Sequence, residues 1–143
     1  MNSRAFLQLA QRLLIKEKNP EGFRTTISRA YYAAFNVTSE FLKAIDCQIP
    51  DGPQGHSQAE FRLNNAGDTA LAEIATYLGD LRTERNAADY RLSKTHVEHE
   101  EFAQNMVDVA GRIIGELDTC NRSSQRKNKA KAAIKTYMKS TKQ

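Results

Sequence analysis

The chain has 143 residues, of which 40% are hydrophobic and 27% are charged, and its formal net charge is +4. A chain of this length can bury one core without metal or disulfide support, so we expect a single main domain. The N-terminal apolar run carries charges, which excludes a signal peptide or membrane span there and predicts a cytoplasmic protein. Cys47 and Cys120 lack metal-ligand spacing and are interpreted as reduced thiols, with a disulfide between them as the alternative.

Positive charge is concentrated at the C-terminal end. No acidic residue follows Asp118, and eight of the 21 Lys and Arg lie there, which leaves 13 bases against 17 acids in the preceding body. The body therefore carries about −4 and the tail about +8. A basic tail on an acidic body suggests a polyanion, an acidic protein or the body's own surface as its partner.

Apolar residues recur three and four positions apart through most of the chain. No segment shows sustained period-two alternation, so we predict an all-α, antiparallel bundle of four or five helices. The first helix is expected over 3–18 with Ser3 as its N-cap, and a longer helix over 22–46 should form the centre of the core. Two prolines and two glycines predict a loop over 49–55.

The second half of the chain predicts three further helices. A short one is expected over 56–66, and a long one over 68–90 with its first residue, an aspartate, as the N-cap. Thr95 and Glu98 have the spacing of a capping box, which predicts that the last core helix starts there and runs through Leu117.

We therefore divide the chain into a helical bundle over 1–119 and a basic segment over 120–143, with 120–124 as a linker. An apolar stripe among the tail lysines consists of Ala130, Ala133, Ile134, Tyr137 and Met138. This pattern predicts either a basic amphipathic helix that folds onto a partner or the body, or a segment that is disordered in isolation.

The stretch LRTERNAADY, residues 81–90, holds two arginines, two acids, an amide and a phenol within barely three helical turns. Four of its polar side chains recur on one face: Arg82, Arg85, Asn86 and Asp89. One interpretation is a solvated face with intrahelical pairs linking Arg82, Arg85 and Asp89. A second segment, SRAYYAAF at 28–35, favours a functional surface instead. Its small residues let two helices approach closely, while each phenol needs a hydrogen-bond partner.

The order of SRAYYAAF, a Pro/Gly loop with His56, and LR…RNAADY resembles the prokaryotic HEPN-domain family over 1–119. The resemblance implies a small helical bundle, dimeric and toxin-like, of the kind paired with a minimal nucleotidyltransferase antitoxin. Active members are metal-independent ribonucleases in which an arginine, usually a polar residue after it, and a histidine four to six positions on meet at a dimer interface. Such a histidine handles the proton of the attacking 2′-hydroxyl, and the arginine stabilises charge on the phosphate.

On this resemblance Arg85 matches the arginine and Asn86 the polar residue, while Tyr90 replaces the histidine. A phenol with a pKa near 10 is a poor general base at neutral pH, so Tyr90 is a weak substitute. A nearby pair, Arg91 and His96, also has a four-residue gap. We interpret that spacing as accidental, because a helix break should separate the two residues.

The family's nucleotidyltransferase partner in some cases modifies a tyrosine just beyond the histidine. Leu92 stands at that position here, which argues against the same mode of control. His96 and His99 lie beside three glutamates and could in principle hold a divalent metal. We favour a solvated helix start whose acids interact with the helix dipole, and predict neither a metal site nor a cofactor.

We therefore predict an RNA-binding protein of HEPN type, with metal-independent endoribonuclease toxin activity as the catalytic form of this hypothesis. The catalytic candidates are Arg85, Asn86 and Tyr90, and the RNA-binding candidates are Arg82, Asp89, Lys127, Lys131 and Lys135. The alternative is a noncatalytic dimeric module that binds nucleotide or a partner protein through the same cluster. A third hypothesis assigns nucleic-acid binding to the tail lysines, in a salt-sensitive manner.

Overall fold

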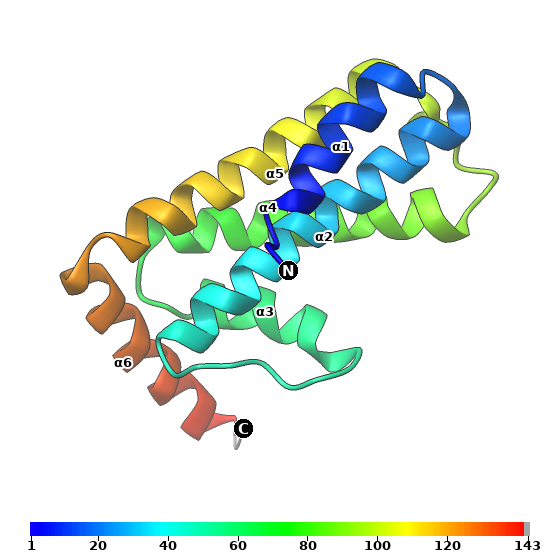
Figure 1. Ribbon diagram of the computed structural model, residues 1–143. Coiled ribbons are helices and arrows are strands. Elements are labelled where there is room, and N and C mark those ends of the chain that lie inside the picture. Colours follow the sequence, from blue (N-terminus) through cyan, green and yellow to red (C-terminus); the bar gives the residue numbers. More distant parts are fainter. Residues whose placement is uncertain (142–143) are drawn as a thin grey trace.

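The computed structural model describes residues 1–141, which form six α-helices and one short 3₁₀ turn (Figure 1). The elements are α1 (Ala5–Lys16), α2 (Pro20–Ala44), α3 (Gln54–Asn64), α4 (Thr69–Tyr90), η1 (Thr95–Glu98), α5 (Glu100–Asn121) and α6 (Ser124–Ser140). No strand occurs in these residues, and the prediction of an all-α helical bundle is confirmed.

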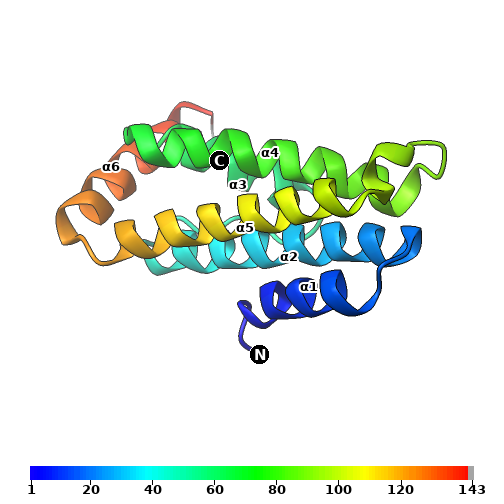
Figure 2. The ribbon, with the colours of Figure 1, turned by 90° about the horizontal axis from the view of Figure 1, so that it is seen from above.

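The three longest helices, α2, α4 and α5, lie lengthwise against one another (Figures 1 and 2). Helix α2 contacts both of the others and runs antiparallel to α4, while α1 covers one side of α2 and α5 (Figure 2). Helix α3 packs against α4, and α6 closes the end of the bundle at which α2 ends and α4 begins. In residues 1–141, no helix is both long enough and apolar enough to cross a bilayer.

Helix α2 is the centre of the core because nearly every turn of it buries side chains. The Asn19 side chain caps its start by accepting a hydrogen bond from the Gly22 amide at 2.7 Å, and Pro20 occupies the first turn, where its missing N–H costs nothing. Ile27, Tyr31 and Leu42 are completely buried. Each such side chain contributes about 1.5–3 kcal/mol by leaving water.

The start of α5 differs from its prediction. Thr95 to Glu98 forms the 3₁₀ turn η1 rather than a capping box, and α5 begins at Glu100 after His99, without a side-chain cap. The reason is that the Glu98 carboxylate accepts a hydrogen bond from Nε of the buried Arg24 at 2.8 Å. The capping box is therefore replaced by a tertiary contact.

Two further local predictions need correction. Ser3 does not cap α1; the backbone N–H of Arg4 instead bonds to the Asn2 side chain at 2.9 Å, and the Ser3 hydroxyl is buried without a hydrogen bond to any described residue. The segment 120–124 is not an extended linker, since α5 continues through Asn121 and only two residues separate it from α6.

The basic segment is a helix that packs on the body. Ala130 and Ile134 of α6 are completely buried, as the apolar stripe predicted. Arg126 bonds to Asp68 at 2.8 Å and to Glu116 at 2.8 Å. Part of the tail's positive charge is therefore neutralised by acids of the body, which was one of the three partners that its charge suggested.

Both cysteines are buried free thiols, so the alternative of a disulfide between them is wrong. Burial raises the pKa of the Cys47 and Cys120 thiols, which keeps them protonated at neutral pH. The Cys47 sulfur lies 4.0 Å from the backbone carbonyl of Lys131, so α6 packs directly over it.

Candidate functional site

The contact between α2 and α4 brings the two sequence motifs together. The phenol of Tyr32, from SRAYYAAF, accepts a hydrogen bond from Nη2 of Arg85, from LRTERNAADY. The Arg85 guanidinium carbon also lies 5.8 Å from the ring centre of Tyr31, 4.9 Å from that of Tyr32 and 5.5 Å from that of Tyr90. Contacts at these distances attract a cation to the ring faces.

Arg85 is held by groups of its own chain. Its Nε lies 3.0 Å from a carboxylate oxygen of Asp89, an ion pair that lacks the geometry of a hydrogen bond, and Nη1 donates to the Asn86 side chain at 3.1 Å. The side chain is only 13% exposed. Because a guanidinium carries five N–H groups, one N–H on each terminal nitrogen of Arg85 makes no hydrogen bond to any described residue.

The network extends along α2 from Asp89. The Ser28 hydroxyl donates to Asp89 at 3.1 Å and accepts a hydrogen bond from Nη2 of Arg29 at 3.2 Å. The Arg29 guanidinium lies over the rings of Phe6, at 5.6 Å, and Tyr32, at 4.9 Å, and no described carboxylate pairs with it. We call Ser28, Arg29, Tyr32, Arg85 and Asp89 the Arg85 cluster.

Arg82 faces α3 rather than the Arg85 cluster. Its Nη1 donates to the Glu60 carboxylate at 2.9 Å. A Cβ on Gly79 would lie 2.9 Å from that same carboxylate, so the glycine leaves the room that Glu60 needs to reach α4. The expected intrahelical chain linking Arg82 and Asp89 through Arg85 is therefore only half correct: Arg85 pairs with Asp89, and Arg82 pairs across helices.

His56 is the functional candidate that the sequence motifs did not place. It lies in the first turn of α3, where Nδ1 is 2.6 Å from the Tyr31 hydroxyl and the ring stacks on Phe35 at 4.2 Å. Burial lowers the pKa of His56 below its ordinary 6.5, and the positive charges of Arg82 and Arg85 lower it further. His56 is therefore neutral at pH 7 and can accept a proton.

Tyr31, the partner of His56, is itself completely buried. Desolvation raises the pKa of its phenol well above the usual value of 10, so the phenol stays protonated. A neutral phenol and a neutral imidazole share the 2.6 Å contact, which leaves the second ring nitrogen of His56 without a partner among the described residues.

The structure places the predicted site residues in two separate regions. Arg82, Arg85, Asn86, Asp89 and Tyr90 all lie in the last turns of α4, and Tyr90 is 71% exposed. The predicted RNA-binding residues Lys127, Lys131 and Lys135 lie on α6, toward the opposite end of the bundle (Figures 1 and 2). Lys135 pairs with Asp46 at 3.2 Å. The lysines and the α4 arginines therefore do not form one continuous site.

Arg91 and His96, whose four-residue gap we interpreted as accidental, lie on different elements as expected. Arg91 follows the last residue of α4, and His96 lies in η1, where its Nε2 is 2.5 Å from a carboxylate oxygen of Glu84. Within residues 1–141, no three side chains of His, Cys, Asp or Glu lie close enough together to hold a metal ion.

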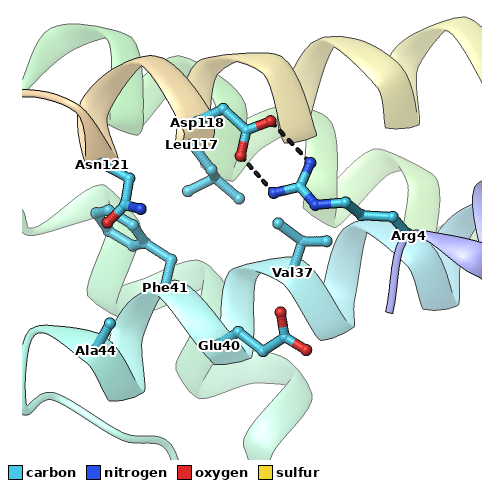
Figure 3. A pocket seen from close by; sticks show the side chains of 8 residues that line it. All are labelled: Arg4, Val37, Glu40, Phe41, Ala44, Leu117, Asp118 and Asn121. Carbon is cyan, nitrogen blue, oxygen red and sulfur yellow. Dashed lines mark hydrogen bonds and ion pairs between the residues drawn. The ribbon is translucent and has the colours of Figure 1, made fainter. Parts of the chain in front are cut away.

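Away from the Arg85 cluster, a hollow of about 230 Å³ lies between the N-terminus and the ends of α2 and α5 (Figure 3). Arg4 spans it and binds both carboxylate oxygens of Asp118, at 2.8 and 2.5 Å. This ion pair lowers the pKa of Asp118. The remaining side chains are mostly apolar, and the single strong cation is already used, so the hollow has little chemistry to offer a ligand.

The sequence left open whether His56 reaches the region around Arg85, and sequence reasoning missed Arg29 and Glu60 there. The available signal was the buried phenol of Tyr31, which had to find a partner, and a Pro/Gly loop that could return a histidine to α2. Nothing in the local sequence specifies the contact of Glu60 with α4, because it depends on how α3 packs. No protein-family model, curated protein or solved structure matches this chain.

Proposed function

We propose that this chain is an RNA-binding protein of HEPN type that holds single-stranded RNA on the face formed by the Arg85 cluster. One observation carries the proposal: Arg85 is fixed among three tyrosine rings, with two N–H groups left for an anion. Two such groups suit the bidentate recognition of a phosphate. One of these rings, that of Tyr90, is exposed, and an exposed aromatic ring beside an arginine is typical of surfaces that stack unpaired bases.

The proposal includes metal-independent RNA cleavage. Tyr90 occupies the position of the family's histidine, and His56 would take over the role of that histidine as the proton acceptor. The 2′-hydroxyl proton would pass to His56, and the 2′ oxygen would form a bond to phosphorus. The bond from phosphorus to the 5′ oxygen would break, and that oxygen would take a proton from water. The products are a 2′,3′-cyclic phosphate and a 5′-hydroxyl end. Arg85 would stabilise the charge that develops on the phosphate, and the positive charge of Arg82, which also acts on the His56 ring, would add to this effect.

Binding of fluorescein-labelled single-stranded RNA by wild type and Arg85→Ala tests the proposal. A charge-assisted contact to phosphate contributes about 1.5–3 kcal/mol, so the variant should bind at least tenfold more weakly. Arg112→Ala, on α5, is the matched control, because Arg112 likewise pairs with a carboxylate, that of Glu73, and lies over a tyrosine ring. Equal affinity of the wild-type protein and Arg85→Ala would refute the site.

Cleavage is tested separately by incubating the protein with RNA and EDTA. The wild-type protein should release fragments with cyclic phosphate ends, and both Arg85→Ala and His56→Gln should not. Expression in cells should then arrest growth only for the wild-type protein, as the toxin hypothesis requires. An RNA that is bound but stays intact would remove the enzymatic part and leave the binding part.

The second candidate is a noncatalytic dimeric module, with a homodimer or a nucleotidyltransferase as the partner. It is favoured by the exposure of two large side chains at the end of α4, Tyr90 at 71% and Leu92 at 80%. Exposed apolar side chains beside a polar network are typical of interfaces. Light scattering measures the molecular mass of the wild-type protein and of Leu92→Asp and distinguishes the candidates. A noncatalytic module requires a dimer that Leu92→Asp dissociates, and the addition of RNA should not change the molecular mass of either protein.

A further inference from the structure

A hollow of about 320 Å³ lies between α2 and the loop that leads to α3. We call it the loop hollow. Its volume lies at the lower end of the range typical of small-ligand sites. Its walls combine apolar and aromatic side chains with two polar ones: Phe35, Ile49, Pro50, His56, Ser39 and Asp51.

The loop that forms its rim is held from both sides. Arg62 donates from Nη1 to the backbone carbonyls of Cys47, at 3.0 Å, and Gln48, at 2.5 Å. Gly52 has a φ of +88°, a conformation that other residues rarely adopt, and its carbonyl accepts a hydrogen bond from Gly55 at 3.1 Å. The hollow is therefore preformed rather than created by a mobile loop.

Two polar side chains of the loop hollow are unpaired within residues 1–141. Neither the Asp51 carboxylate nor the Ser39 hydroxyl makes a hydrogen bond or ion pair with another described residue. An ionised carboxylate only accepts hydrogen bonds, so a ligand placed against Asp51 must supply donors.

The loop hollow adjoins the arginines through His56. This side chain lines the hollow and also bonds to Tyr31, and the charges of Arg82 and Arg85 act on its ring. A nucleotide whose phosphate binds the arginines would thus have its base beside the loop hollow, where the rings of Phe35 and His56 lie stacked.

We propose that the loop hollow is a nucleobase subsite that selects guanine, a step that rests on the proposed RNA binding and names its specificity. Guanine alone presents two adjacent N–H donors, N1–H and N2–H, on its Watson–Crick edge, and both can bond to the Asp51 carboxylate. Adenine and cytosine place an acceptor beside a single donor group, and uracil flanks one donor with two carbonyls. These bases would set a lone pair against the carboxylate.

The test compares two labelled RNA 12-mers, one of uridines only and one with a single central guanosine. The wild-type protein should bind the guanosine-containing RNA roughly tenfold more tightly or better, as expected for one good bidentate pair. Asp51→Asn should abolish this preference without weakening the binding of the uridine RNA, because uridine gains no hydrogen bond from the carboxylate. Asp108→Asn, at an exposed acid in the groove between α1 and α5, is the matched control and should keep the preference.

A second measurement follows the ring protons of His56 by NMR during titration with guanosine 5′-monophosphate, with His56→Gln to assign the signal. The signal should shift with this nucleotide in the wild-type protein, but not with uridine 5′-monophosphate and not in Asp51→Asn.

Equal affinity for the two RNAs, a preference for another base, or a preference that survives in Asp51→Asn would overturn the guanine subsite and leave RNA binding standing. If neither RNA binds, the proposed function fails. The nucleotide titration then decides the subsite by itself: a guanosine-specific shift supports it, and an unchanged signal overturns it.

Discussion

Two arginines lie at the α2–α4 contact, and they are used in opposite ways. Arg24, on α2, is 8% exposed and directs its guanidinium into the end of α4. It donates to the backbone carbonyls of Ala87, Ala88, Arg91, Leu92 and Lys94 and to the Glu98 carboxylate. Arg85, on α4, bonds only to side chains.

The difference separates an arginine that is fixed by backbone groups from one that is held only by side chains. Backbone carbonyls at a helix end have few other partners, so a guanidinium that binds them stays in place as long as the protein is folded. Side chains such as Asn86, Asp89 and the phenol of Tyr32 can rotate towards water or a ligand. Arg24 therefore ends α4 and starts the η1 turn, while Arg85 retains donors that can be redirected to an anion.

The largest expected effect is that of Arg24→Ala on stability. Removing one partner of a buried ion pair costs about 3–5 kcal/mol, and here the carbonyls at the end of α4 lose their donor as well. Urea denaturation should show this loss in the free energy of unfolding. Arg112→Ala, which removes a 62% exposed side chain from an ion pair, is the control and should stay within about 0.5 kcal/mol. A loss below 1 kcal/mol for Arg24→Ala would contradict the structural role.

A smaller effect on stability is expected at Arg85 and its partner Tyr32. Arg85→Ala and Tyr32→Phe should each lower the free energy of unfolding by about 1–2 kcal/mol, because their partners can turn to solvent. The double variant should lose less than the sum of the two, with a coupling of about 1 kcal/mol. Additive losses would mean that the contact of Arg85 with Tyr32 contributes nothing, and would weaken the case that this arginine is held in place for a ligand.

The smallest effect is a pH dependence that arises from His56. Its pKa is lowered in the folded state, so folding favours the neutral ring; the stability is complete above 6.5 and declines as the pH falls through the folded-state pKa. The midpoint of urea denaturation should therefore drop between pH 7.5 and pH 5.5, by more in wild type than in His56→Gln. The pKa values of Asp68 and Asp118 are lowered from 3.8, so these carboxylates change the stability only below pH 3.8 and do not contribute between pH 7.5 and pH 5.5. An identical drop in both proteins would mean that another group titrates.

The fold was largely predictable because its signals are local. The apolar period indicated the long helices, and Asp68 marked the start of α4 by capping chemistry that a few residues determine. The start of α2 was predicted at residue 22, two residues late, because Asn19 and Pro20 were interpreted as a helix break although they cap and begin the helix. The prediction failed at Thr95 and Glu98, where a local capping pattern competed with the buried guanidinium of Arg24. That competitor is about 70 residues away in sequence and leaves no local signal.

The candidate site was predictable in one helix and not in the others. The polar spacing in α4 indicated Arg85, Asn86 and Asp89 as neighbours, since helical geometry alone determines it. The contribution of α3 was not visible, because His56 and Glu60 reach the site only through the path of the preceding loop. The separation of the α6 lysines from α4 likewise depends on which end of the bundle α6 covers.

The packing of α6 over Cys47 has a consequence for chemical labelling. A thiol beneath a helix reacts with an alkylating reagent only when the helix lifts away. The ion pairs of Arg126 weaken in salt, whereas the burial of Ala130 and Ile134 does not. The salt dependence of the alkylation rate of Cys47 thus separates electrostatic from apolar attachment of α6, with the native cysteine as the reporter.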